Sequence, residues 1–137
     1  MAARDETVLQ GGRLKAYRPL PEAERRRAFE AGLAAYQQGD WFLAHELWEP
    51  AWMGTPDLAE RELLQGLIKL AAAFVHGARA NPVGVAKNLR GARGRLEAGR
   101  SAGAQLGVDA DDLIQRVDAW LESPGGPAID VRLSKTP

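Results

Sequence analysis

The chain has 137 residues, of which 45% are hydrophobic and 26% are charged, and it contains no cysteine. This length and composition predict one small domain with a hydrophobic core. Lys and Arg together number 18, as do Asp and Glu, so no overall charge favours nucleic acid or a membrane surface. The lack of cysteine excludes disulfides, thiolate zinc sites and a cysteine nucleophile, and it fits a cytoplasmic protein.

Membrane insertion and export are also disfavoured. The N-terminal residues lack the apolar core of a signal peptide. The longest apolar-rich run, 63–75, is interrupted by Gln65 and Lys69 and is too short to span a bilayer.

Hydrophobic periodicity divides the rest of the chain into helices. Residues 1–20 show no sustained period, which predicts an irregular N-terminal arm. Asp40, Thr55 and Asn81 are suitable N-caps, and Pro56 and Pro82 suit first helical turns. Pro50 lacks a donor and should end or kink the helix that contains it. The predicted helices cover 21–38, 41–53, 56–79, 82–100 and 110–122.

The C-terminal residues 123–137 begin as a linker. Ile129, Val131 and Leu133 then alternate with polar residues, which predicts an extended tail against the body. The sequence therefore indicates an all-α fold, a compact bundle of about five helices in antiparallel pairs. We expect a single helical domain over 21–122, between the arm and the tail.

Residues 28–56 carry part of the spacing of a tetratricopeptide repeat. The matching positions are Gly32, Ala44, Trp48, Ala51 and Pro56. A single repeat cannot bury its own face, so we interpret this spacing as the packing of one helical hairpin.

Several short motifs occur together. The chain reads F-x-x-G-x-x-x-Y-x-x-G-D-W-F-x-A-H-E-x-W-E-x-x-W, then Q-G-L-I-x-L-A-A-A, then H-x-x-x-x-N. Over about residues 25–96 this combination resembles a small prokaryotic family known as domain of unknown function number 309. The resemblance implies a compact, mainly helical fold and no established activity. Ala80 departs from the family, which often has glycine there. The residues that carry the resemblance are Phe29, Gly32, Tyr36, Gly39, Asp40, His45, Glu46, Glu49, Trp52, Gln65, Gly66, His76 and Asn81.

Residues 40–52 concentrate chemistry-bearing side chains among apolar ones. His45 and Glu49 share one helix face, because they are four residues apart. Burying carboxylates is costly unless they are paired, so a polar cluster here is either a site or a structural network. We expect this cluster to contain His45, Glu46, Glu49, Trp52, Glu62, Gln65 and His76.

Two interpretations of this cluster stay open. In one, a divalent transition metal is bound by His45, Glu49 and His76, and Glu46 is the general base of a hydrolase-like enzyme. In the other, the cluster is a buried hydrogen-bonded network that fixes how the helices dock. The second is favoured, because H-E-x-x-E is not the H-E-x-x-H motif of zinc proteases.

The segment 79–100 is basic and includes Arg79, Lys87, Arg90 and Arg93. Such a helix face can follow phosphates, but it has no interleaved aromatic residues. The acidic segment 105–123 can neutralise it. The leading hypothesis is therefore a non-enzymatic binding or interaction module. Its partner would be a second copy or another protein, and exposed parts of the tryptophan-rich helix would make the contact. Nucleic-acid binding through 79–100 is a further alternative.

Overall fold

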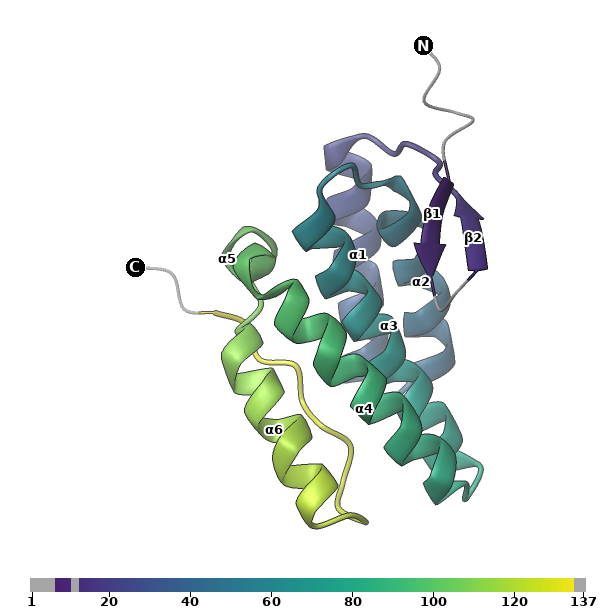
Figure 1. The fold of residues 1–137 in the computed structure, drawn as a ribbon, viewed down its shortest axis with the longest axis vertical. Coiled ribbons are helices and arrows are strands. Elements are labelled where there is room, and N and C mark those ends of the chain that lie inside the picture. Colours follow the sequence, from purple (N-terminus) through teal and green to yellow (C-terminus); the bar gives the residue numbers. More distant parts are fainter. Residues whose placement is uncertain (1–6, 11–12, 135–137) are drawn as a thin grey trace.

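The computed structural model describes residues 7–10 and 13–134 and confirms the all-α prediction (Figure 1). None of the described helices has the length and apolar content needed to cross a membrane. The elements are β1 (Thr7–Gln10), β2 (Arg13–Ala16), α1 (Glu22–Gln37), α2 (Trp41–Gly54), α3 (Leu58–Ala78), α4 (Pro82–Ala98), the 3-10 turn η2 (Arg100–Ala102), α5 (Gly103–Leu106) and α6 (Ala110–Glu122).

Polar side chains start the helices much as the sequence predicts. Asp40 accepts a hydrogen bond from the backbone N–H of Leu43, and Asn81 accepts one from Gly84. At the start of α3 the predicted cap is wrong: Asp57 caps the helix, and its carboxylate accepts from Glu60 N. Helix α2 continues through Pro50 to Gly54, so the proline does not end it.

The short elements β1, β2 and α5 were not predicted. Strands β1 and β2 form an antiparallel hairpin with Thr7 opposite Ala16, where an irregular arm was expected. Four-residue strands are at the lower limit of the roughly four to eight residues over which strand alternation can be recognised. The short helix α5 was missed for the same reason. Residues 1–6 of the predicted arm lie outside the described residues.

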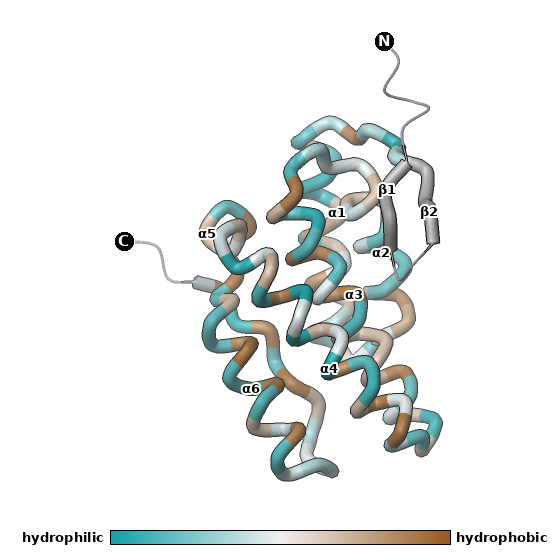
Figure 2. The backbone as a smooth tube through the Cα atoms, in the orientation of Figure 1, coloured by the Kyte–Doolittle hydropathy of each residue, from teal (hydrophilic) through white to brown (hydrophobic). Residues whose placement is uncertain are grey.

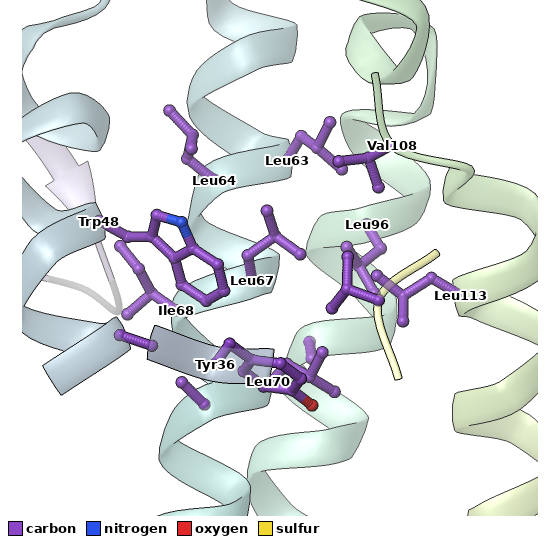
Figure 3. Close-up of a cluster of buried hydrophobic side chains, with 14 of the residues drawn as sticks. Tyr36, Trp48, Leu63, Leu64, Leu67, Ile68, Leu70, Leu96, Val108 and Leu113 are labelled. Atoms are coloured by element: carbon purple, nitrogen blue, oxygen red, sulfur yellow. The ribbon is translucent and has the colours of Figure 1, made fainter. Parts of the chain in front are cut away.

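The helices pack largely in chain order, α1 on α2, α2 on α3, α3 on α4 and α4 on α6 (Figure 1). Hydrophobic and hydrophilic residues alternate along these helices (Figure 2), and the buried hydrophobic ones form one core cluster. Helix α3 is central, and its leucines meet Trp48 on one side and Leu96 and Leu113 on the other (Figure 3). Burying side chains of this size contributes roughly 1.5–3 kcal/mol each.

The C-terminal tail runs back along α6, as the yellow segment of Figure 1 shows. Ile129 and Val131 are buried while Asp130 and Arg132 are exposed, which confirms the predicted alternation. Leu133 is the exception, because it is exposed. Val108 and Leu133 form an antiparallel bridge that attaches the tail to the body.

Candidate functional site

His45 and Glu46 lie together on the outer side of α2. His45 Nδ1 is 3.5 Å from Glu46 Oε2, and their side chains are 31% and 51% exposed. Glu49 is partly exposed on the same helix, whereas Trp52 and Gln65 are buried. In the described part of the chain, no hydrogen bond joins these five side chains to one another. The sequence predicted that these five residues form one cluster, but the described contacts do not form the predicted network.

Glu62 and His76 face α4, away from this group. Both carboxylate oxygens of Glu62 accept from Arg95 Nη1, at 3.0 and 3.2 Å. The prediction that Glu62 joins the cluster with His45 and Glu49 is therefore wrong, because its carboxylate is paired with α4. His76 Nδ1 lies 3.2 Å from Asn81 Nδ2, and an amide nitrogen can only donate. The H-x-x-x-x-N motif thus fastens the end of α3 to the start of α4.

A metal centre formed by His45, Glu49 and His76 is not supported. Over 7–10 and 13–134, no group of three or more His, Asp or Glu side chains is arranged to hold a metal ion. His76 is engaged by Asn81, whereas His45 is beside Glu46. Without a metal ion at this position, Glu46 would have no metal-bound water to deprotonate as a general base.

The predicted basic face is neutralised only in part by its neighbours. Arg93 donates to Asp118 on α6 at 2.6 Å and to Glu97 at 3.1 Å. These acidic partners hold the pKa of the Arg93 guanidinium above its ordinary value, the hydrogen bond to Asp118 being the main cause. Arg100 similarly pairs with Asp111. Arg79, Lys87 and Arg90 are exposed.

The larger of the two cavities that we describe is an apolar groove, which the sequence did not predict. It encloses about 940 Å³ between the start of α4, the ends of α3 and α6, and the first turn of the tail. In Figure 1 these elements meet at the lower end of the molecule. The residues that line it are Trp41, Phe74, Gly77, Ala78, Ala80, Asn81, Pro82, Val83, Val85, Ala86, Trp120, Pro124, Gly125, Gly126 and Ala128.

Three aromatic rings form the base of this apolar groove. Phe74 is central: its ring centroid lies 5.8 Å from that of Trp41 and 6.3 Å from that of Trp120. Trp120 Nε1 is buried and has no hydrogen-bond partner among the described residues. Buried indole N–H groups usually find an acceptor. The groove therefore has an apolar lining, and the Trp120 indole N–H is buried beside it without an acceptor among the described residues.

Tyr36 supports the groove from below. Its ring packs edge-on against Trp41 with centroids 4.9 Å apart, and its hydroxyl donates to the carbonyl oxygen of Ile129 in the tail at 2.5 Å. Burial is the main cause that raises the pKa of the Tyr36 hydroxyl, and the Asp130 carboxylate adds to it. Tyr36 thus stays a neutral donor that holds two walls of the groove together.

A second cavity, of about 390 Å³, lies between α1 and the start of α3. Three of its four charged residues, Arg25, Arg26 and Glu60, are already bonded to the protein. Arg25 pairs with Glu60 at 3.3 Å and donates to Leu20 O, while Arg26 donates to Gln105 O. This cavity therefore offers a ligand fewer free polar groups than its composition indicates. Neither cavity has His45, Glu46 or Glu49 in its lining.

Sequence reasoning missed the apolar groove because its residues come from five separate segments. Trp41, Phe74 and Trp120 come from α2, α3 and α6, and nothing in the sequence brings these three residues together. The one available signal was the Ala80-Asn81-Pro82 turn, where the family often has glycine. Ala80 has φ 57°, a left-handed conformation that glycine adopts more easily.

Residues 29–88 match the model of the family described as Domain of unknown function (DUF309), which confirms the predicted resemblance. No curated protein matches the chain. The matched segment runs from the middle of α1 into α4 and includes Trp41 and Phe74 but not Trp120. Two of the three aromatic residues at the base of the groove thus belong to the family segment.

Proposed function

We propose that this DUF309-containing protein is a non-catalytic binding module that takes an uncharged, apolar ligand in the groove at the start of α4. One observation carries the proposal: the groove is lined by three aromatic rings and by no ionisable side chain. Apolar ligands gain from such a surface, because water is released from both sides. A charged ligand would lose its hydration there without gaining a counter-ion.

The dimensions fit a small molecule. Ligand pockets generally enclose about 300–1,000 Å³ and combine apolar walls with a few polar groups. Here the cavity of about 940 Å³ is lined almost entirely by apolar and aromatic side chains, together with the amide of Asn81. We therefore infer a ligand with an aromatic or aliphatic body and few polar groups.

The hydrolase alternative receives less support from this geometry. General acid-base catalysis needs a titratable group within hydrogen-bond reach of the reacting atom. The groove lining contains no such side chain, and Glu46 is outside it, half exposed on α2. A ligand held in the groove would meet aromatic carbon and an amide, which favours binding over turnover.

A fluorescence titration tests the proposal with a neutral apolar dye, N-phenyl-1-naphthylamine. Val83 is 76% exposed at the rim of the groove, and Val83→Asp places a carboxylate there. We expect saturable dye binding by the wild type and about 10-fold weaker binding by this variant, the cost of a charge against apolar surface.

Leu58→Asp is the matched control. Leu58 is 70% exposed, starts α3 as Val83 nearly starts α4, and does not line the groove. An acidic residue in the first turn of a helix is favourable, so both variants should keep the fold. Dye binding that is absent from the wild type, or that both variants weaken equally, would reject the groove as the site.

A further inference from the structure

A second feature lies on the outer face of α3 and α4, independent of the groove. Gly91 has no side chain, and Lys69 of α3 lies across it: a Cβ at position 91 would be 3.1 Å from Lys69 Cδ and 3.7 Å from its Nζ. Lys87 and Arg95 are one turn before and one turn after Gly91, on the same face of α4. Three cations therefore follow one line along the two helices.

These three cations have fewer carboxylate partners than positive charges. Arg95 is paired with Glu62. Lys69 and Lys87 form no ion pair within the part of the chain that the structure describes. By contrast, Arg93 and Arg100 on the same basic segment have carboxylate partners from neighbouring elements. Three positive charges thus face the single carboxylate of Glu62.

The charged form of Lys69 is destabilised by this arrangement. Partial burial is the largest cause that lowers the pKa of its ammonium, followed by repulsion from Arg95 and Lys87. Like charges kept close together without a counter-ion destabilise the folded protein. An anion bound between them would offset the repulsion, and its attraction would compensate the cost of burying the Lys69 ammonium.

We propose that Lys69, Lys87 and Arg95 form a binding site for the phosphate group of a small phosphorylated ligand. The charge balance favours phosphate over a simple carboxylate, because three cations against Glu62 leave two positive charges and a phosphate monoester carries close to two negative ones. Lysine ammonium groups bind phosphate as point charges, and Arg95 adds a planar donor. Gly91 provides the space in which Lys69 reaches α4.

Inorganic pyrophosphate is the probe, added without divalent metal and at constant ionic strength adjusted with potassium chloride. Isothermal calorimetry and thermal unfolding then report binding. We expect saturable binding that Lys69→Met and Lys87→Met each weaken about 10-fold or more, as loss of a charged hydrogen-bond donor does. Arg27→Met removes the same charge from the exposed side of α1 and should bind as the wild type does.

Gly91→Glu gives a second, independent test, because it supplies a carboxylate between the cations. Its Cβ meets only the flexible end of Lys69, so the helix should tolerate it. We expect this variant to unfold at a higher temperature and to lose pyrophosphate binding. The groove variant Val83→Asp should bind pyrophosphate normally, which separates this proposal from the groove function.

Three results would overturn the phosphate site. They are the absence of pyrophosphate binding to the wild type, equal binding by Lys69→Met, and equal weakening by Arg27→Met. A single-stranded oligonucleotide distinguishes the source of the phosphate. Oligonucleotide binding that depends on Arg79 and Arg90, with no binding of pyrophosphate, would replace the small-ligand site by a nucleic-acid surface.

Discussion

The indole of Trp48 lies directly on Gly32, so that a side chain at position 32 would overlap the ring. The indole Nε1 donates to the carbonyl oxygen of Phe29 at 2.9 Å, one turn before that glycine. The same helix face thus provides both the space and the acceptor for Trp48. This contact locks α2 against α1 and explains why the F-x-x-G motif and the tryptophan occur together.

A methyl group at this contact should be costly. Gly32→Ala is expected to lower the free energy of unfolding by about 1–3 kcal/mol, because the ring has no room to shift within a packed core. Gly94→Ala is the matched control, since nothing lies within 4 Å of that position in α4. It should gain up to about 1 kcal/mol of stability from helix propensity. Urea unfolding measures both, and equal effects of the same sign would contradict the packing role.

Tyr36 should make stability depend on pH in the alkaline range. Its pKa is raised in the folded protein, whereas the unfolded chain releases the proton near the ordinary value of about 10. The stabilisation is therefore complete below pH ~10 and is lost as the pH rises above it, by up to about 1.4 kcal/mol per pH unit.

The comparison with Tyr36→Phe isolates this effect, because other titrating groups are common to both proteins. The free energy of unfolding should be higher for the wild type at pH 8, owing to the bond to Ile129 O, and the difference should shrink between pH 10 and 11.5. Two parallel pH curves would show that Tyr36 ionises as freely in the folded protein as in the unfolded chain.

The turn at the groove rim stores backbone strain that a single substitution should release. Ala80 has φ 57°, which costs a residue with a Cβ about 1–2 kcal/mol, while glycine loses some backbone entropy. Ala80→Gly should therefore raise the free energy of unfolding by up to about 1 kcal/mol. Ala34→Gly, on the exposed side of α1, should lower it by about the same amount. Thermal unfolding of the pair checks the sign, and a loss in both would refute strain at position 80.

Association into a homodimer stays a prediction, and the structure now indicates which residues of α2 to change. Trp48 and Trp52 are buried, so the exposed apolar side chains of this helix are Phe42, at 59%, and Leu43, at 43%. If two copies meet here, sedimentation velocity should show a dimer that Phe42→Ser dissociates and Leu58→Ser does not. A wild-type protein that sediments as a monomer at every concentration would end this prediction.

The sequence predicted the helices well because their signals are local. Asp40 and Asn81 cap α2 and α4 as expected, and α6 begins and ends as predicted. The site was predicted poorly because proximity along one helix does not bring side chains from other helices. His45 and Glu46 are adjacent in the structure, yet Glu62 faces Arg95 and His76 faces Asn81. Which side of α3 faces α2 depends on packing that a single sequence does not display.

The groove, too, could not be predicted from local sequence patterns. Trp41, Phe74 and Trp120 are apolar residues with helical spacing, and most such residues are core. They line a cavity only because the start of α4 and the end of α6 lie on either side of it. No local pattern distinguishes a tryptophan in a groove from one in a core, so Trp120 and Trp48 looked alike in the sequence.

That difference between tryptophans provides the most direct measurement of the groove function. The chain has four tryptophans, so a ¹⁵N-labelled sample gives four indole N–H signals, and single substitutions to phenylalanine assign them. On addition of N-phenyl-1-naphthylamine, we predict that the signals of Trp41 and Trp120 shift, while those of the buried Trp48 and Trp52 stay in place. Shifts confined to Trp48 and Trp52, or no saturable shift of Trp41 and Trp120, would contradict the assignment of the groove as the binding site.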